Sequence, residues 1–240
     1  MRSQRTTPIL HQIEEIAESV PGWTPVDQLY ALFNLAFLTA GQGGDIVEIG
    51  SWCGRSTAVL GLAARLAGGR VFAIDLFPAR DDWQQNPDGT YSFAVETDEG
   101  RIAAYQSQTV WPEPFLEDIA PLYEKHDSIR DIFDETIARY RLQKIVLAHR
   151  GDSAFCARLA AEGIQCRMAF IDGDHSYQAV CQDIQNVERI LRPGGWICFD
   201  DAFSAYEGVN KAIEEHILGS ASYDLCQQLT RKFFVARRKA

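Results

Sequence analysis

The chain has 240 residues, of which 46% are hydrophobic and 23% are charged, and it carries a net charge of −10 at pH 7. This length suits one large domain with a substantial core, and a second independent domain would be cramped. The acidic balance would repel a phosphate backbone and disfavours nucleic-acid substrates. The longest apolar run, residues 29–40, includes Asn34 and Thr39 and is too short to span a bilayer.

Six cysteines are scattered along the chain without a Cys-x-x-Cys pair. In a chain of this size, that spacing disfavours a disulfide framework and a zinc site. Residues 1–12 lack the basic-then-apolar order of a secretory signal. We therefore expect a protein of the cytoplasm that has no membrane partner.

Apolar runs typical of buried strands alternate with stretches of helical periodicity, which predicts a mostly parallel sheet with helices on both faces. The predicted elements are, in order, helices at 9–20 and 25–39, a strand at 45–49, a helix at 56–66, a strand at 70–75, a helix at 129–140, a strand at 144–149, a helix at 153–162, a strand at 168–172, a helix at 177–191, a strand at 196–200, a helix at 209–217 and strands at 223–227 and 232–236. The last two strands are expected to form an antiparallel hairpin.

Residues 77–125 interrupt this rhythm with five prolines, several aromatic residues and little periodicity. A long irregular insertion in a compact domain is typical of a lid or a substrate-binding segment. We expect a single domain over residues 1–240 with this insertion inside it. The N-terminal helices, within residues 1–44, are candidates for homodimer contacts.

A glycine-rich turn follows the strand predicted at 45–49. Gly50 and Gly54 permit a tight turn that a ligand can approach closely, and the helix after them offers free N–H groups. The G-x-x-x-G spacing differs from the G-x-G-x-x-G of dinucleotide sites. Glu48 suits an ammonium group better than a pyrophosphate, and Asp75 ends the next strand, where it could accept ribose hydroxyls.

This turn resembles motif I of class I S-adenosylmethionine (SAM)-dependent methyltransferases, and Asp75 is similar to the ribose-binding acid of that family. The resemblance implies a Rossmann-like fold, with a mostly parallel seven-stranded sheet, a C-terminal antiparallel hairpin and helices on both faces. It also implies SAM as cofactor. The implied cofactor-binding residues are Glu48, Gly50, Ser51, Trp52, Gly54, Ser56, Asp75, Asp152, Ser153 and Asp172. The Gly-Asp-Ser segment that holds Asp152 is also a common helix cap.

Three further carboxylates follow predicted strands. Asp172 comes after the strand at 168–172, and Asp200 and Asp201 come after the strand at 196–200. The topology brings these strand ends to the same edge as the glycine turn. Converging carboxylates repel one another unless a cation or protons compensate them. Oxygen ligands without thiolates suit Mg²⁺, Mn²⁺ or Ca²⁺.

The pattern resembles the metal-dependent O-methyltransferases, and the Ile-Asp-Gly-Asp-His-Ser-Tyr stretch looks like that of a bacterial branch acting on sugars and natural products. The resemblance implies that Asp172, Asp200 and Asp201 bind the metal. His175 stands where these families have a catalytic lysine; histidine can accept a hydroxyl proton at neutral pH. The predicted reaction is methylation of a small-molecule hydroxyl group, on a sugar, a phenol or another natural product.

Other interpretations remain open at this point. Asp174 and His175 could belong to a helix cap, and Asp200 and Asp201 could begin an ordinary loop. A class I methyltransferase without a metal, an NAD(P)-dependent oxidoreductase and a non-catalytic SAM-binding protein are the alternative functions. The joint presence of His175 and the three carboxylates favours the enzyme.

Overall fold

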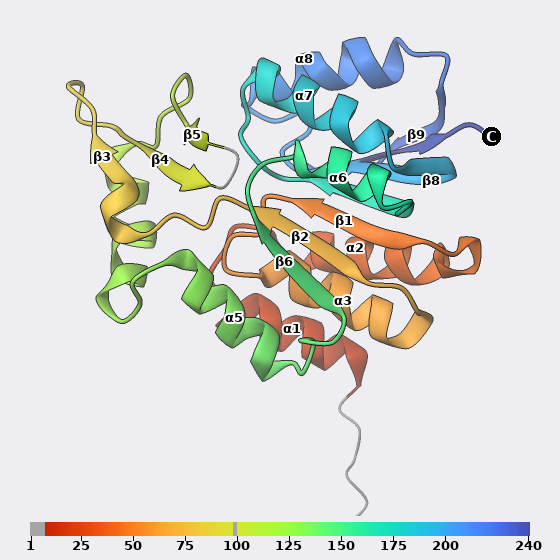
Figure 1. Cartoon of the computed structure of the whole chain (residues 1–240), viewed down its shortest axis with the longest axis horizontal. Helices are drawn as coiled ribbons and strands as arrows, with labels where there is room; N and C mark the ends of the chain where they lie inside the picture. Colours follow the sequence, from red (N-terminus) through yellow and green to blue (C-terminus); the bar gives the residue numbers. More distant parts are fainter. Residues whose placement is uncertain (1–7, 98–99) are drawn as a thin grey trace, which may run out of the picture.

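A twisted seven-stranded sheet forms the centre of the computed structural model, which describes residues 8–97 and 100–240 (Figure 1). Its strands, in spatial order, are β6 (Val146–Arg150), β2 (Val71–Asp75), β1 (Asp45–Ile49), β7 (Cys166–Ile171), β8 (Leu191–Phe199), β10 (Phe234–Arg238) and β9 (Tyr223–Gln228). The first five are parallel, and β10 and β9 run antiparallel to their neighbours. The predicted fold class, including the closing hairpin, is confirmed.

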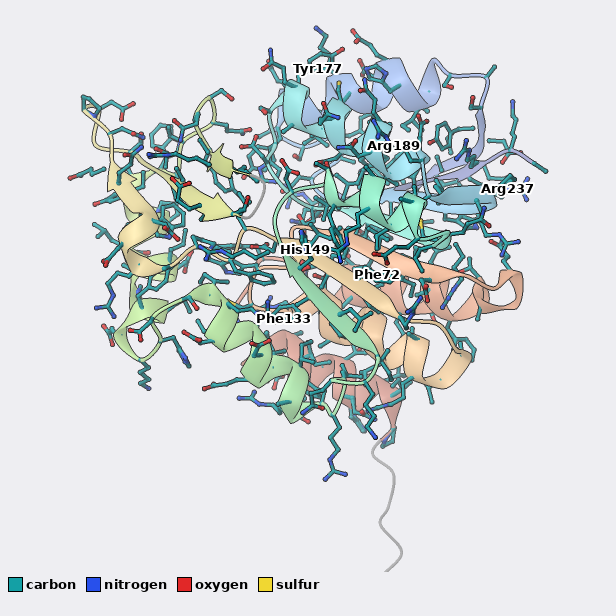
Figure 2. The ribbon with its side chains drawn as sticks, viewed as in Figure 1. Phe72, Phe133, His149, Tyr177, Arg189 and Arg237 are labelled. Atoms are coloured by element: carbon teal, nitrogen blue, oxygen red, sulfur yellow. The ribbon has the colours of Figure 1, made fainter. Side chains whose placement is uncertain are left out.

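Successive residues of a strand point to opposite faces of the sheet, and in the central strands both sets are apolar. Helices therefore cover both faces. One face carries α1 (Ile9–Ser19), α2 (Val26–Leu38), α3 (Arg55–Ala67) and α5 (Ile129–Arg139). The other face carries α6 (Phe155–Ala161), α7 (Tyr177–Glu188) and α8 (Glu207–Ile213), which continues into a π-helical turn at Glu214–Leu218. Phe133 of α5 and Phe72 of β2 belong to the two opposite cores and are labelled in Figure 2.

The insertion is more ordered than the sequence predicts. It contains an antiparallel sheet of β3 (Trp83–Gln85), β4 (Tyr91–Thr97) and β5 (Gly100–Ala104), followed by short helical turns at Pro112–Pro114, Phe115–Ile119 and Ala120–Glu124. The ring of Trp83 lies 4.7 Å from Phe93 and 5.1 Å from Phe115, so aromatic packing holds these short elements together. Figure 1 places this small sheet to one side of the central sheet.

The last parallel strand begins earlier than its predicted range of 196–200. Strand β8 already starts at Leu191 and includes Pro193, Gly194 and Gly195. Leu191 pairs with Cys166, Trp196 pairs with Met168, and the register shifts between the two pairs. Gly194 has φ +79°, so the extra residues form an irregularity inside the strand rather than a turn before it.

The strand order reverses between β1 and β7. From β1 the chain adds β2 and then β6 on one side of the sheet, and it then crosses to the other side of β1 to add β7 and β8. Open α/β sheets bind ligands at such a point, outside the carboxyl ends of the strands. The N–H of Asp172 donates to the carbonyl of Ile49 at 2.8 Å, so the glycine turn and the first acidic residue are neighbours here. Within the described residues, no helix has the length and apolar character needed to cross a membrane.

Candidate active site

Glu48 lies at the base of the glycine turn and is completely buried. Its Oε2 atom accepts hydrogen bonds from Ser51 Oγ at 2.8 Å and from Thr57 Oγ1. Burial raises the pKa of Glu48 to about 7, against the lowering effect of the Ser56, Thr57 and Ser51 hydroxyls. Its Oε1 atom has no hydrogen-bond partner among the described residues. Glu48 therefore shapes the turn and retains a spare acceptor, as an ammonium-binding acid would require.

Asp75 closes the same turn from the end of β2. Its two carboxylate oxygens accept the N–H groups of Trp52 at 2.8 Å and Phe77 at 2.6 Å. Burial raises the pKa of Asp75, and these backbone N–H groups oppose that shift. Trp52 itself has φ +45°, so the carboxylate of Asp75 holds a sharp bend beside the strand end. The predicted contact of Asp75 with ribose hydroxyls stays a prediction.

Trp52 is also covered from the N-terminal region. The ring of Trp23, which precedes α2, lies 5.8 Å from the ring of Trp52. The indole N–H of Trp23 points to Asp118 of the insertion at 3.5 Å. The glycine turn, the α1–α2 connection and the insertion therefore meet around these two tryptophans, a meeting that the sequence did not predict.

The Gly-Asp-Ser segment at residues 151–153, whose Asp152 and Ser153 are predicted to bind the cofactor, follows β6. The N–H of Gly151 donates to the carbonyl of Asp75 at 3.0 Å, which places the segment next to the turn. Asp152 accepts the N–H of Ala154 at 2.8 Å, as in a helix-capping turn. Ser153 is buried, and its hydroxyl accepts a hydrogen bond from Asn186 of α7 at 3.0 Å. The Ser153 side chain thus serves packing between α6 and α7, and its role toward a cofactor stays a prediction.

The three predicted metal carboxylates come together at the ends of β7 and β8. Burial raises the pKa of Asp172 well above its usual value, and the charges of Asp200 and Asp201 raise it further. Burial also opposes ionisation of Asp201, but the hydrogen bond with His175 and the charge of Lys232 outweigh it and lower its pKa. The backbone of Asp201 has φ +53°, which turns the chain sharply as it leaves the strand.

Two residues that the sequence did not single out complete this acidic cluster, which comprises Asp172, Asp200 and Asp201. The ammonium of Lys232, from the segment between β9 and β10, lies 3.1 Å from both Asp200 Oδ2 and Asp201 Oδ1. The side-chain amide of Gln28 on α2 donates to Asp200 Oδ1 at 2.8 Å. Neither residue belongs to a recognisable motif, and only the fold brings them to the strand ends.

His175 is fixed on the rim of the cluster. Its Nε2 atom lies 3.1 Å from Asp201 Oδ2. The ring of Tyr206 stacks on it at 4.1 Å, and the ring of Tyr105 from the insertion lies 6.4 Å away. Asp172, His175 and Asp201 each offer one ligand atom, and these atoms lie within 4.8 Å of one another. The ring is therefore placed either to accept a proton or to bind a cation, but its single lone pair cannot do both.

Asp174 connects the site to the insertion. Its carboxylate accepts the N–H of Ser176 at 2.8 Å and the N–H of Tyr105 at 2.9 Å. The cap of α7 is Ser176, whose hydroxyl accepts the N–H of Ala179 at 3.3 Å. The last strand of the small sheet, β5, therefore ends in contact with the loop after β7 that carries His175.

A cavity of about 410 Å³ lies within the insertion itself. It is lined by Arg80, Trp83, Phe115, Ala120, Tyr123 and Glu124. None of the predicted site residues lines it, and the indole N–H of Trp83 donates to Tyr123 Oη at 2.8 Å in its wall. The cavity is therefore separate from the acidic cluster.

Residues 47–202, more than half of the chain, match the family model described as a methyltransferase domain. The chain therefore belongs to the methyltransferase-domain family, and its strand order with the glycine turn is that of a class I SAM-dependent methyltransferase. The matched region contains both the glycine turn and the acidic cluster, and it ends one residue after Asp201.

Solved structures of similar fold include several O-methyltransferases. NovP superposes with a TM-score of 0.61 at 16% identity, covering 90% of this chain and 81% of NovP. TomG from Streptomyces achromogenes, which is involved in tomaymycin synthesis and was solved with SAM, has a TM-score of 0.58 at 16% identity, covering 98% and 92%. CalS11, a TDP-rhamnose 3′-O-methyltransferase of calicheamicin biosynthesis, has a TM-score of 0.55 at 14% identity, covering 97% and 96%. At these identities the likeness establishes the fold.

Proposed function

We propose that this methyltransferase transfers the methyl group of SAM to a hydroxyl oxygen of a small molecule, with a divalent cation held in the acidic cluster. The observation that carries the proposal is the position of the cluster: three carboxylates at the strand ends, one of them directly against the glycine turn. The names of the similar structures, which include a sugar and a natural-product O-methyltransferase, support a small-molecule acceptor.

The chemistry of the cluster fits a hard divalent cation. Three carboxylates and the single ammonium of Lys232 together carry two net negative charges when ionised. The raised pKa of Asp172 has burial as its main cause and uncompensated neighbouring charge as its second, and a cation would relieve the second. Asp172 and Asp201 would hold the cation, with Asp200 beside them. When bound, it would supply Lewis acidity that lowers the pKa of the acceptor hydroxyl.

The residues of the chain then orient the reaction and take up the proton. The lowered pKa of Asp201 keeps that carboxylate ionised, so neutral His175 carries its proton on Nε2 and leaves the lone pair on Nδ1. Nδ1 accepts the hydroxyl proton. The acceptor oxygen forms a bond to the methyl carbon as the carbon–sulfur bond breaks, and the electron pair remains on the sulfur of S-adenosylhomocysteine. Positioning supplies much of the rate of such a displacement.

The insertion is proposed to cover the acceptor. Its Tyr105 donates a backbone hydrogen bond to Asp174, and its ring faces His175. Burial raises the pKa of the Tyr105 hydroxyl, and the charges of Asp174 and Asp75 raise it further. The side chain therefore stays neutral, and its aromatic ring lies near the proposed base.

The test is transfer of a ¹³C-labelled methyl group from SAM to a panel of sugars, phenols and hydroxylated polyketides, with Mg²⁺ or with a chelator. We expect an O-methyl carbon signal that requires Mg²⁺. Asp201→Asn should abolish turnover while S-adenosylhomocysteine still binds in calorimetry. Asp134→Asn, an exposed position on α5, is the matched control and should behave like the unaltered enzyme.

Each part of the proposal fails on a different result. Unchanged turnover in both Asp201→Asn and the chelator arm would eliminate the role of the cation and leave a metal-independent methyltransferase. A labelled methyl group on nitrogen or carbon would eliminate O-methylation.

A further inference from the structure

Gln28 is a fully buried amide in a helix that otherwise buries apolar side chains, including Leu29, Leu32 and Phe33. A buried amide lowers stability unless its hydrogen-bonding atoms are paired. Its place on α2, far from the motifs of the sequence, therefore calls for a specific partner at the end of the side chain.

That partner is Asp200. The Gln28 nitrogen donates to Oδ1 at 2.8 Å, and the N–H of Asp201 donates to the same oxygen at 2.8 Å. Lys232 holds the other oxygen, Oδ2, at 3.1 Å. Three donors from three separate segments thus fix the orientation of this carboxylate, and Gln28 is the uncharged side chain among them.

The other end of the amide is unpaired. Gln28 Oε1 is buried and has no hydrogen-bond partner in the part of the chain that the structure describes. Leaving such an oxygen unpaired in the interior lowers stability, because the oxygen has lost its hydrogen bonds to water without replacement. An ionised carboxylate cannot donate to it, whereas a water molecule can donate one O–H to the amide and the other to a carboxylate.

The geometry points to Gln28 as a positioning residue of the acidic cluster: its nitrogen fixes Asp200, and its unpaired Oε1 would accept a hydrogen bond from a water molecule that enters the cluster with a cation. This inference rests on the proposed cation site. It extends the site to helix α2 and assigns a role to a residue outside the matched methyltransferase region. Outer partners of this kind tune metal affinity by about 10–100-fold.

The experiment measures Mn²⁺ binding by the loss of the free-ion EPR signal, with S-adenosylhomocysteine present. Gln28→Met keeps the side-chain length and removes both polar atoms. We expect its Mn²⁺ dissociation constant to rise by roughly 10-fold or more. Its affinity for S-adenosylhomocysteine and its melting temperature should stay close to those of the unaltered protein, a separation that a merely structural role would not produce. Asn34→Met, exposed on the same helix, is the control.

Gln28→Asn, which keeps the amide but withdraws it by one methylene group, provides the measurement if Gln28→Met does not fold. Equal Mn²⁺ affinity in the unaltered protein and the Gln28 variant would overturn the role of Gln28 while the cation site stands. Absence of Mn²⁺ binding in the unaltered protein would overturn the cation site itself, and the inference with it.

Discussion

Gly50 and Asp172 lie so close at the ends of β1 and β7 that a Cβ atom on Gly50 would overlap the carbonyl oxygen of Asp172. Gly50 also has φ +87°, a conformation that residues with a side chain rarely adopt. The backbone of the glycine turn therefore packs directly on the backbone of Asp172, with no room for a side chain between them. In the proposed reaction, this contact would set how far a bound sulfonium lies from an acceptor at the cluster.

Gly50→Ala should destabilise the fold and weaken binding of S-adenosylhomocysteine. Gly68→Ala is the matched control, because Gly68 has a similar φ of +90° but open space where a Cβ would stand. Both variants introduce the backbone strain, and only Gly50→Ala adds the clash. We expect Gly50→Ala to lose roughly 2 kcal/mol more of the free energy of unfolding than Gly68→Ala, measured by urea denaturation. Equal losses would contradict a special role for the contact with Asp172.

Lys232→Met should make stability depend more strongly on Mg²⁺. Without the ammonium, the carboxylates of Asp200 and Asp201 lose their cationic partner, so the free energy of unfolding without metal should fall by roughly 1–3 kcal/mol. A divalent cation would then compensate more charge, and Mg²⁺ should raise the melting temperature of the variant more than that of the unaltered protein. Lys211→Met removes an exposed lysine that pairs with Glu215 and serves as control. Identical Mg²⁺ shifts in all three proteins would contradict the prediction.

Trp23→Ala should weaken cofactor binding by removing the ring that packs on Trp52. An aromatic pair contributes about 0.5–1.5 kcal/mol beyond its buried area, which corresponds to an increase of about 2–10-fold in the dissociation constant of S-adenosylhomocysteine by calorimetry. Trp111→Ala removes a tryptophan that is 73% exposed and should leave the constant unchanged. If both variants bind equally well, the α1–α2 connection does not support the turn.

Asp183→Asn should remove a pH dependence of stability. Burial raises the pKa of Asp183 to about 7, and the Ser153 hydroxyl only partly opposes the shift. The unfolded chain loses this proton near pH 4. Between about pH 4 and 7 the folded protein therefore binds the extra proton, and its free energy of unfolding falls as pH rises, by at most about 1.4 kcal/mol per pH unit.

Asparagine has no proton to lose, so Asp183→Asn should become more stable relative to the unaltered protein across that same interval. Urea denaturation at a series of pH values measures the difference. Asp81→Asn, at an exposed carboxylate, should give no such trend. A constant difference between Asp183→Asn and the unaltered protein would show that Asp183 ionises normally in the fold.

Much of the site could be predicted because its residues follow strands. Gly50, Asp75, Asp172 and Asp200 each end or follow a buried apolar run, and parallel strands place such ends on one edge. The antiparallel closing hairpin could also be predicted, because β9 and β10 are two short runs that follow the last helix with only a few residues between them.

Other parts of the fold and the site could not be predicted from local sequence patterns. Gln28 sits inside a helix whose sequence indicates only burial. The insertion sheet depends on packing of Trp83 against Phe93 and Phe115, contacts between short segments that propensity does not specify. Strand β8 begins before the predicted residue 196: Pro193 and Gly194 favour a turn, but pairing of Leu191 with Cys166 overrides that preference.

The bond between Gln28 and Asp200 joins residues 172 positions apart, and it has a consequence for how the enzyme matures. Contacts of such long sequence separation require a large loop to close and tend to form late in folding. Strand β10, which pairs with β8 up to Phe199 beside the cluster, also follows every other strand of the central sheet along the chain, so a nascent polypeptide lacks this support of the cluster until the final hairpin has been synthesised. Competence to hold a cation should therefore appear abruptly, with completion of the tertiary structure, and not gradually as the helices form.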